Sequence, residues 1–278
     1  MQLYSVLPPA DLVPFIRGFF FVANLKKEGE DDLFKLFPIG TPNLIFYLEG
    51  EVATVIDTIR YNGETLTVNG QIMKYFTTTV SPGARFAGIA FHPTGMYRLF
   101  GLNAGLFINR MLPAEKFLDV ETYIRNLRKA LSDEEIVNAH LVFLRSKLPA
   151  SYSVLPVVEQ CIYDINRLEG NLKVDQLAAE YNCSRRYLEK HFLYSVGVSP
   201  GKYKRRTRFY NVLKRIIMAD VQMDMILSEF DFYDRSHFLK DFEYFMGEKP
   251  RVYFESDHPF MKIVLRESYF LITSGARL

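Results

Sequence analysis

Apolar and polar positions alternate along residues 34 to 91, as in the segments FKLFPI, NLIFYLEG and IMKYFTTTV. Alternation with a period of two predicts β-strands that bury one face, and the Gly, Pro and Asn residues between the runs predict turns. Asn62 and Gly63 form a dipeptide typical of a tight hairpin. Several short strands at near-regular spacing indicate a compact antiparallel sandwich or barrel.

The period changes after Pro93, where apolar residues begin to recur at helical spacing. The first helical region is interrupted between Gly101 and Gly105. A capping box at 132–135 predicts the start of a helix that runs towards Leu148, and another helix over 154–168 can end at Gly170. From there on the pattern is entirely helical.

Two short amphipathic helices around a tight turn are predicted within LKVDQLAAEYNCSRRYLEKHF, residues 172–192. Ser184 is placed to cap the second helix, and Leu188 and Phe192 form its buried pair. The polar side chains left at the start of that helix are Arg185, Arg186, Glu189 and Lys190. A helix of this shape can enter the major groove of DNA, and the alternative is a packed helix pair with solvated arginines.

A second, weaker copy of this pattern occupies residues 223–246, with a turn at 231–234 and an inner face of Phe238, Phe242 and Phe245. Between the copies, Ser199 and Pro200 predict the start of a helix that runs to Ala219. Two reading units joined by a stiff helix can address successive major grooves, roughly 34 Å apart. The duplication favours DNA binding over the alternative.

Charge is unevenly distributed, although the 278 residues carry a net charge of only +2. Residues 171–219 hold eleven Lys and Arg against three Asp and Glu, a local net charge of +8, whereas residues 220–255 carry −5. The basic segment suits phosphates and the acidic one does not. The predicted phosphate contacts are Ser184, Lys202, Lys204, Arg205 and Arg206, with a merely solvated face as the alternative.

Residues 165–253 resemble the AraC/XylS class of bacterial transcription regulators. The resemblance rests on Ser184-Arg185-Arg186-Tyr187-Leu188, Phe192, Gly197, Ser199-Pro200, Tyr203, Arg208, Phe232, Ser236-His237-Phe238, Phe242, Gly247 and Pro250. It implies base contacts from the first recognition helix by Arg185, Arg186, Glu189 and Lys190, and from the second by Arg235, Ser236, Leu239 and Lys240. It also implies a structural role for Arg208. The two alternatives for this side chain are a buried ion pair with an acidic neighbour and a contact with DNA.

The chain departs from that pattern at Asp231, where the family usually has Gly, and at Leu227, where a small residue is usual. Asp tolerates positive φ less well than Gly. Together with the local negative charge, this predicts that the second unit contacts DNA weakly or serves mainly as a scaffold.

The N-terminal part has a looser resemblance to the sensor regions that precede such DNA-binding ends, through PPADLVPFIRGFFF, FPIGTPNLIFYLEG and FAGIAFHPTGMYRLFG. It implies a cupin-like barrel followed by helices, in a domain that binds a small effector or dimerises, with the barrel mouth as the place for an effector. Candidate wall residues are Phe37, Phe46, Tyr47, Tyr75, Phe76 and Phe91, most of which are expected to be plain core. A metal site is not expected, because His92 is the single histidine of the β region and is more typical of a strand end bonded to backbone.

The predicted fold is therefore α+β: an N-terminal cupin-like antiparallel β-barrel with helices, and a C-terminal all-α domain of two helix-turn-helix units joined by a long helix. The expected divisions are 1–112 for the sensor, 113–165 for a helical linker or dimerisation region, 166–255 for DNA binding and 256–278 for a tail. Within the tail, residues 261–274 alternate as a strand would and are expected to pack on the sensor or on a partner.

The expected partners are double-stranded DNA, a small effector, a second copy of the chain and RNA polymerase, with no cofactor or metal. No nucleophile with a partnered base, phosphate loop or metal-ligand spacing stands out, so we expect no enzyme activity. No membrane span or export signal is readable, which predicts a cytoplasmic protein. Cys161 and Cys183 suggest small core residues. A protein-interaction module with degenerate DNA binding is the alternative function.

Overall fold

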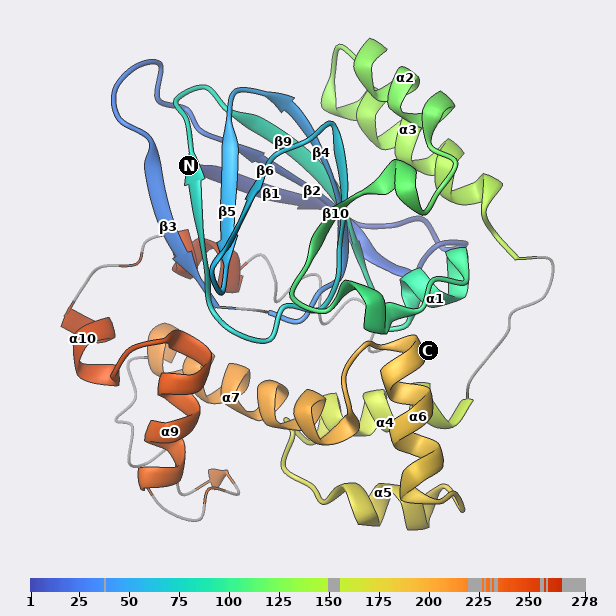
Figure 1. Ribbon diagram of the computed structural model, residues 1–278, viewed down its shortest axis with the longest axis vertical. Coiled ribbons are helices and arrows are strands. Elements are labelled where there is room, and N and C mark those ends of the chain that lie inside the picture. The colour runs from blue at the N-terminus through green and yellow to red at the C-terminus, as the bar shows by residue number, and fades with distance from the viewer. Residues whose placement is uncertain are drawn as a thin grey trace.

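The computed structural model describes the chain except residues 38, 150–155, 220–226, 228, 231, 233–234, 256–257, 259 and 267–278. Its N-terminal part holds two antiparallel sheets that face each other, and its C-terminal part is helical (Figure 1). The predicted α+β fold is confirmed.

The larger sheet has six strands in the order β1-β2-β9-β4-β7-β10 and the smaller has four in the order β3-β8-β5-β6. The strands of the larger sheet are β1 (Gln2–Val6), β2 (Ile16–Ala23), β9 (Arg85–Phe91), β4 (Asn43–Glu49), β7 (Leu66–Asn69) and β10 (Met111–Pro113). Those of the smaller are β3 (Asp32–Leu36), β8 (Phe76–Val80), β5 (Val52–Ile56) and β6 (Ile59–Asn62).

Alternation along the larger sheet gives it two different buried faces. On β4, Leu44 and Phe46 belong to a core shared with the helices behind the sheet, whereas Asn43, Ile45 and Tyr47 point towards the smaller sheet. Successive side chains of a strand alternate between faces, so the same division continues on the paired strands.

The tight hairpin predicted at Asn62 and Gly63 is wrong. The chain turns between β5 and β6 before this dipeptide, since Ile56 pairs with Ile59 and Asp57 adopts a φ of 54°. After Asn62 the chain crosses to the other sheet, where β7 pairs with β4 and β10. The dipeptide therefore marks a crossover between sheets.

Helices cover the outer face of the larger sheet. They are α1 (Gly95–Phe100), η1 (Ala104–Phe107), η2 (Ala114–Lys116), α2 (Glu121–Lys129) and α3 (Asp133–Ser146). The Ser132 hydroxyl accepts a hydrogen bond from the Glu135 backbone N–H at 3.2 Å, which confirms the predicted cap of α3. Gly101 ends α1 in the left-handed region with a φ of 67°, which confirms the predicted interruption.

The C-terminal helices are α4 (Pro156–Arg167), α5 (Val174–Glu180), α6 (Arg185–Ser195), α7 (Pro200–Ala219), α9 (Arg235–Met246) and α10 (Pro250–Glu255). One hydrophobic core joins α4, α5, α6 and the start of α7, and another joins the rest of α7 to α9, α10 and the segment beyond. Helix α7 thus links two packed units, as the sequence predicts. Most of the residues predicted to form the first helix of the second unit lie outside the described part of the chain.

The segment after α10 differs from its prediction. Residues 260–266 are helical, so the strand predicted from Met261 onward is wrong over 261–266, and residues 267–274 lie outside the described part of the chain. The Phe260 ring lies 4.6 Å from the Phe34 ring of β3, between centroids, so the segment does pack on the β part.

Candidate nucleic-acid interface and internal cavity

Helix α6 begins as a recognition helix would. Asn182 makes the turn before it with a φ of 49°, and the Ser184 hydroxyl accepts a hydrogen bond from the Tyr187 backbone N–H at 3.1 Å. Leu188 and Phe192 are fully buried on its inner side. The predicted helix, cap and buried pair are confirmed.

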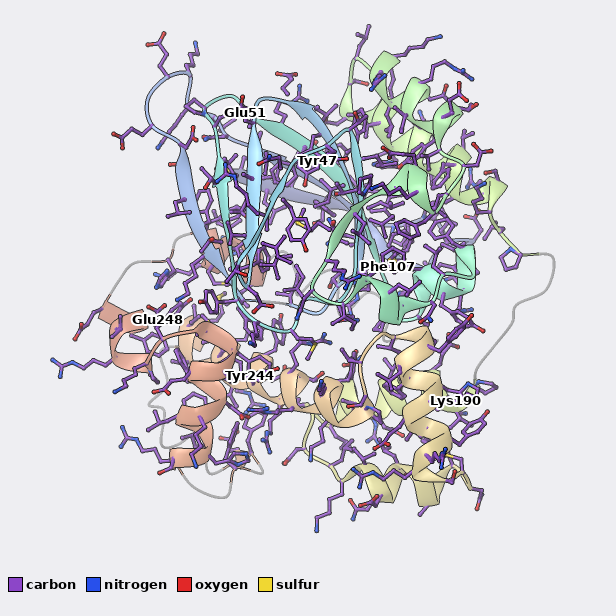
Figure 2. All side chains as sticks on the ribbon, viewed as in Figure 1. Tyr47, Glu51, Phe107, Lys190, Tyr244 and Glu248 are labelled. Carbon is purple, nitrogen blue, oxygen red and sulfur yellow. The ribbon has the colours of Figure 1, made fainter. Side chains whose placement is uncertain are left out.

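The outer side of α6 is polar and exposed. Arg186 and Lys190 reach solvent, and Figure 2 shows Lys190 at the edge of the molecule. Arg185 forms ion pairs with Asp175 at 3.1 Å and with Glu189 at 3.0 Å, and solvent reaches all three side chains. Exposed ion pairs are worth little, so DNA can replace them at low cost.

The cations of α7 differ from one another in the folded chain. Lys202 is exposed, the Lys204 ammonium donates to the Leu172 carbonyl oxygen, and Arg205 pairs with Asp241 at 2.7 Å while remaining 40% exposed. Arg206 is only 3% exposed. The prediction that Arg206 contacts phosphate is therefore wrong for this arrangement, because a buried guanidinium cannot reach DNA.

Arg206 points instead into the contact between the two parts of the chain. Its guanidinium donates to the Gln71 side-chain oxygen and lies 4.8 Å from the centre of the Tyr203 ring. A Cβ added to Gly40, which has a φ of 75°, would lie 2.1 Å from the Arg206 Cζ, so a larger residue there would force the guanidinium to move. Burial lowers the pKa of Arg206 to about 10. Arg206 follows Tyr203 by three residues, on the inner side of the helix.

Helix α9 presents Arg235, Ser236 and Lys240 on its outer side, with Leu239 half-buried. Its inner side carries Asp241, which is fully buried and pairs with Arg208 of α7 at 3.4 Å. The buried ion pair that the sequence left open for Arg208 is therefore the one formed. Asp231, where the sequence departs from the usual Gly, lies outside the described residues.

The β part and the helical part pack directly on each other. Phe37 lies 5.3 Å from Phe209 and 5.9 Å from Phe245, between ring centroids, within the core of α7 and α9. Lys35 forms an ion pair with Glu248 at 2.6 Å, and the Tyr75 backbone N–H donates to the Phe245 carbonyl oxygen at 2.7 Å. These contacts join the β part to α7, α9 and the loop that follows α9.

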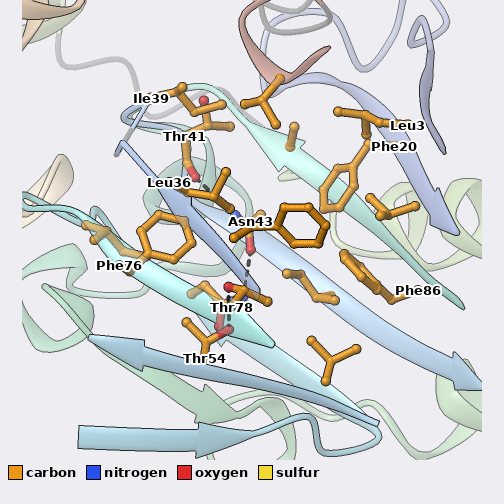
Figure 3. Close-up of a pocket in the computed structure, with 18 of the residues that line it drawn as sticks. Leu3, Phe20, Leu36, Ile39, Thr41, Asn43, Thr54, Phe76, Thr78 and Phe86 are labelled. Atoms are coloured by element: carbon orange, nitrogen blue, oxygen red, sulfur yellow. Dashed lines mark hydrogen bonds between the residues drawn. The ribbon is translucent and has the colours of Figure 1, made fainter. Parts of the chain in front are cut away.

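A cavity of about 200 Å³ lies between the two sheets (Figure 3). Its wall is apolar apart from a few uncharged polar side chains. The polar members include Asn43, Thr54, Asn69 and Thr78, and the C-terminal segment contributes Phe260 and Val264.

Three of the six aromatic residues predicted for this wall lie on it, namely Phe37, Tyr47 and Phe76. Phe46 and Phe91 are placed wrongly by the prediction: they lie on the opposite face of the larger sheet, in the core with the helices. The predicted position of Tyr75 is also wrong, since its ring stacks under the Lys35 ammonium at 4.5 Å and abuts Gly247.

Sequence patterns did not point to Asn69, Thr54, Thr78 or the two residues of the C-terminal segment. Thr54 stands out as the polar residue of the strand VATVI, but only the folded chain places it opposite Thr78. Packing of residues 261–274 on the β part was one expected outcome, but no pattern in the sequence pointed to Phe260 or placed Val264 on the cavity.

Histidine and cysteine side chains show no sign of a reactive centre within the described part of the chain. The His92 ring nitrogen Nε2 lies 3.0 Å from the Val13 carbonyl oxygen, which confirms its predicted backbone bond. Burial raises the pKa of the Cys161 thiol to about 12. Among the same residues, no group of three or more His, Cys, Asp or Glu side chains is placed to hold a metal ion.

Two families match separate parts of the chain. Residues 4–113 match a "Domain of unknown function (DUF6597)", and residues 177–256 match a "Helix-turn-helix domain". The chain is 26% identical over 129 residues to the HTH-type transcriptional activator AarP of Providencia stuartii, an alignment that covers 44% of this chain and 96% of the relative. The helical part thus matches a helix-turn-helix domain and resembles the AraC type, and the chain is a DNA-binding transcriptional regulator.

Solved structures are similar only loosely. ToxT from Vibrio cholerae has a TM-score of 0.48 at 14% identity, over 84% of this chain and 97% of its own. The AraC-like transcriptional activator CuxR has a TM-score of 0.30 at 16% identity, over 77% of this chain and 87% of its own.

Proposed function

We propose that this regulator reads a specific DNA sequence mainly through α6 and that a small effector in the β part controls it. The observation that supports the reading role is the row of exposed Arg185, Arg186 and Lys190 and half-buried Glu189, on a helix whose opposite side is fully packed. Such side chains at the start of a recognition helix meet base edges in the major groove.

We assign supporting roles to the neighbouring surfaces. Ser184 and Lys202 contact phosphates, Lys204 and Arg205 join them by releasing their present partners, and Arg235, Ser236, Leu239 and Lys240 of α9 read a second groove. Not all Lys and Arg residues of α7 can reach DNA, because Arg206 and Arg208 are buried. We therefore expect α6 to dominate affinity and α9 to add less.

The same proposal includes a second copy of the chain, contact with RNA polymerase and a location in the cytoplasm. A homodimer would place two chains on a repeated site, contact with RNA polymerase would convert binding into regulation, and action on bacterial DNA would take place in the cytoplasm. The part of the chain that is described contains no helix able to cross a bilayer. We propose no catalytic role. The divisions at residues 112, 165 and 255 stay predictions.

Selection of bound sequences from a random duplex library, with the full chain at low and moderate salt, tests the proposal. One enriched motif whose affinity falls as salt rises is expected, since each phosphate contact releases counterions. Absence of enrichment at both salts, with or without added candidate effectors, would favour the alternative of a protein-interaction module that no longer reads DNA.

A further inference from the structure

The helical segment 260–266 closes one side of the cavity between the sheets. Phe260 and Val264, one turn apart, line the cavity, and Phe260 contacts Phe34 of β3. Figure 1 shows the segment in red beside the lower end of β3. The cavity is therefore not formed by the β part alone.

The same segment is anchored in the second DNA-binding unit. Met261 and Leu265 are 1% and 0% exposed and belong to the core that contains Phe242 of α9. Phe260 and Val264 thus line the cavity, Val264 also packs against the core of α7 and α9, and Met261 and Leu265 are buried within that core. The short helix 260–266 therefore contacts both the cavity and the second helix-turn-helix unit, and a molecule in the cavity would lie against it.

The chemistry of the wall defines what the cavity can hold. Among the described residues that line it, none carries a charged side chain. A buried charge without a counter-charge is costly, so an ionised ligand is disfavoured. A ligand that fits this wall is uncharged and mostly apolar.

A polar atom on β7 gives the wall a place for a hydrogen bond. The Asn43 amide donates to the Thr41 carbonyl oxygen at 3.2 Å and accepts from the Asn69 amide nitrogen at 2.7 Å. This leaves the Asn69 side-chain oxygen buried and without a hydrogen bond, on a residue 2% exposed. Buried acceptors are nearly always satisfied, which points to a donor on the ligand. Opposite them, the Thr54 and Thr78 hydroxyls already satisfy each other at 3.1 Å (Figure 3).

We propose that the cavity binds an uncharged, mostly apolar molecule with an N–H or O–H donor directed at Asn69, and that segment 260–266 is part of this site. The inference deepens the proposed function and rests on it. The volume of about 200 Å³ exceeds the ~150 Å³ that suffices for benzene, so a small aromatic molecule of about ten non-hydrogen atoms fits. Because the ligand contacts Phe260 and Val264 only when the segment is docked, it stabilises the docked arrangement of the second unit.

Indole is a suitable probe because it is uncharged, apolar and carries one N–H donor. The two matched probes are 1-methylindole, which lacks the donor, and indole-3-carboxylate, which adds a charge. Calorimetry on the full chain is expected to show binding of indole, weaker binding of 1-methylindole and none of the carboxylate. Hydrogen exchange of residues 260–266 is expected to slow when indole is added.

Variants locate the site. Phe260→Ala and Val264→Ala are expected to weaken indole binding about tenfold because each removes part of the wall, whereas Arg266→Ala, exposed on the same segment, leaves it within about twofold. The variant Asn69→Ala is expected to bind indole and 1-methylindole equally. Circular dichroism and thermal unfolding establish that each variant is folded.

The proposal is overturned if neither uncharged probe binds, if the carboxylate binds as tightly as indole, or if Phe260→Ala and Val264→Ala bind indole as the natural chain does. DNA selection on the same preparation distinguishes failure of the proposed cavity site from failure of the proposed DNA-binding function. An enriched motif without probe binding rejects the cavity site alone, and failure of both rejects the proposed function as well.

Discussion

Asp241 of α9, with no exposed side-chain surface, faces Arg208 of α7 across 3.4 Å. Arg205 approaches the same carboxylate at 2.7 Å from the solvent side. One buried acidic group therefore holds the connecting helix α7 to α9. This relationship fixes the direction in which α9 presents its exposed residues.

Replacement of Asp241 by Asn is expected to destabilise the chain by about 3–5 kcal/mol, because it leaves the Arg208 guanidinium buried without its counter-charge. Urea unfolding followed by circular dichroism measures the change. The double variant Arg208→Met, Asp241→Leu removes both charges and is expected to recover part of the stability. Equal stability of the single variant and the natural chain would contradict a structural role for the pair.

Replacement of Arg186 by Ala is expected to relax the preference at one base position, with a decrease of about 1–3 kcal/mol in discrimination. Binding titrations against the selected motif and its single-base variants measure it. Lys202→Ala serves as the control, since removal of a phosphate-binding cation weakens binding to all sequences alike. If both variants weakened binding to all DNA sequences equally, the assignment of a base contact to Arg186 and a phosphate contact to Lys202 would be wrong.

Arg206→Met is expected to leave the salt dependence of DNA binding unchanged, because this guanidinium is buried against Gln71. Lys202→Ala, by contrast, should reduce the slope of log affinity against log salt by about 1. Both slopes come from the same titrations over a range of salt concentrations. A reduced slope for Arg206→Met would mean that Arg206 swings out to meet DNA.

Phe37→Ala is expected to destabilise the contact between the β part and the helical part by about 3–5 kcal/mol, since the ring is 1% exposed within the core of α7 and α9. Calorimetry should show unfolding at a lower temperature and separation into two transitions. Leu33→Ala removes an apolar side chain that is 69% exposed on β3 and is expected to have little effect. Similar destabilisation by both variants would argue against a specific anchor.

Acid is expected to destabilise the β part and its helices between about pH 6.5 and 3. Burial lowers the pKa of both His92 and His140 to about 3 in the folded chain, so the unfolded chain binds more protons throughout this range. The free energy of unfolding then falls as pH falls, by up to about 1.4 kcal/mol per pH unit for each histidine. Urea unfolding at several pH values tests this, and His140→Gln should have a shallower pH dependence than the natural chain.

Local patterns along the sequence were sufficient for most secondary structure. The caps at Ser132 and Ser184, the end of α1 at Gly101 and the buried pair on α6 depend on residues close together in the chain, so their chemistry is readable before folding. The exposure of Arg186 and Lys190 followed in the same way from helical spacing.

Contacts between distant segments were not readable. Phe46 and Tyr47 are neighbours that face opposite sides of the sheet, because alternation reveals two faces without saying which one borders the cavity. Likewise the sequence does not separate Arg206 from Lys202, Lys204 and Arg205, whereas packing of the β part on α7 buries Arg206. For Arg208, the structure supplies Asp241 as the partner of the ion pair that the resemblance left open.

The sequence by itself determined the class of fold, the helix α6 with its cap and buried pair, and the basic segment that follows it, because each depends on short-range periodicity, capping and charge. Only the tertiary structure decided which aromatic residues border the cavity, which cations stay within reach of DNA, and that the segment 260–266 belongs to both parts of the molecule. Those outcomes depend on which surfaces meet when strands and helices far apart in the chain bury their apolar faces together.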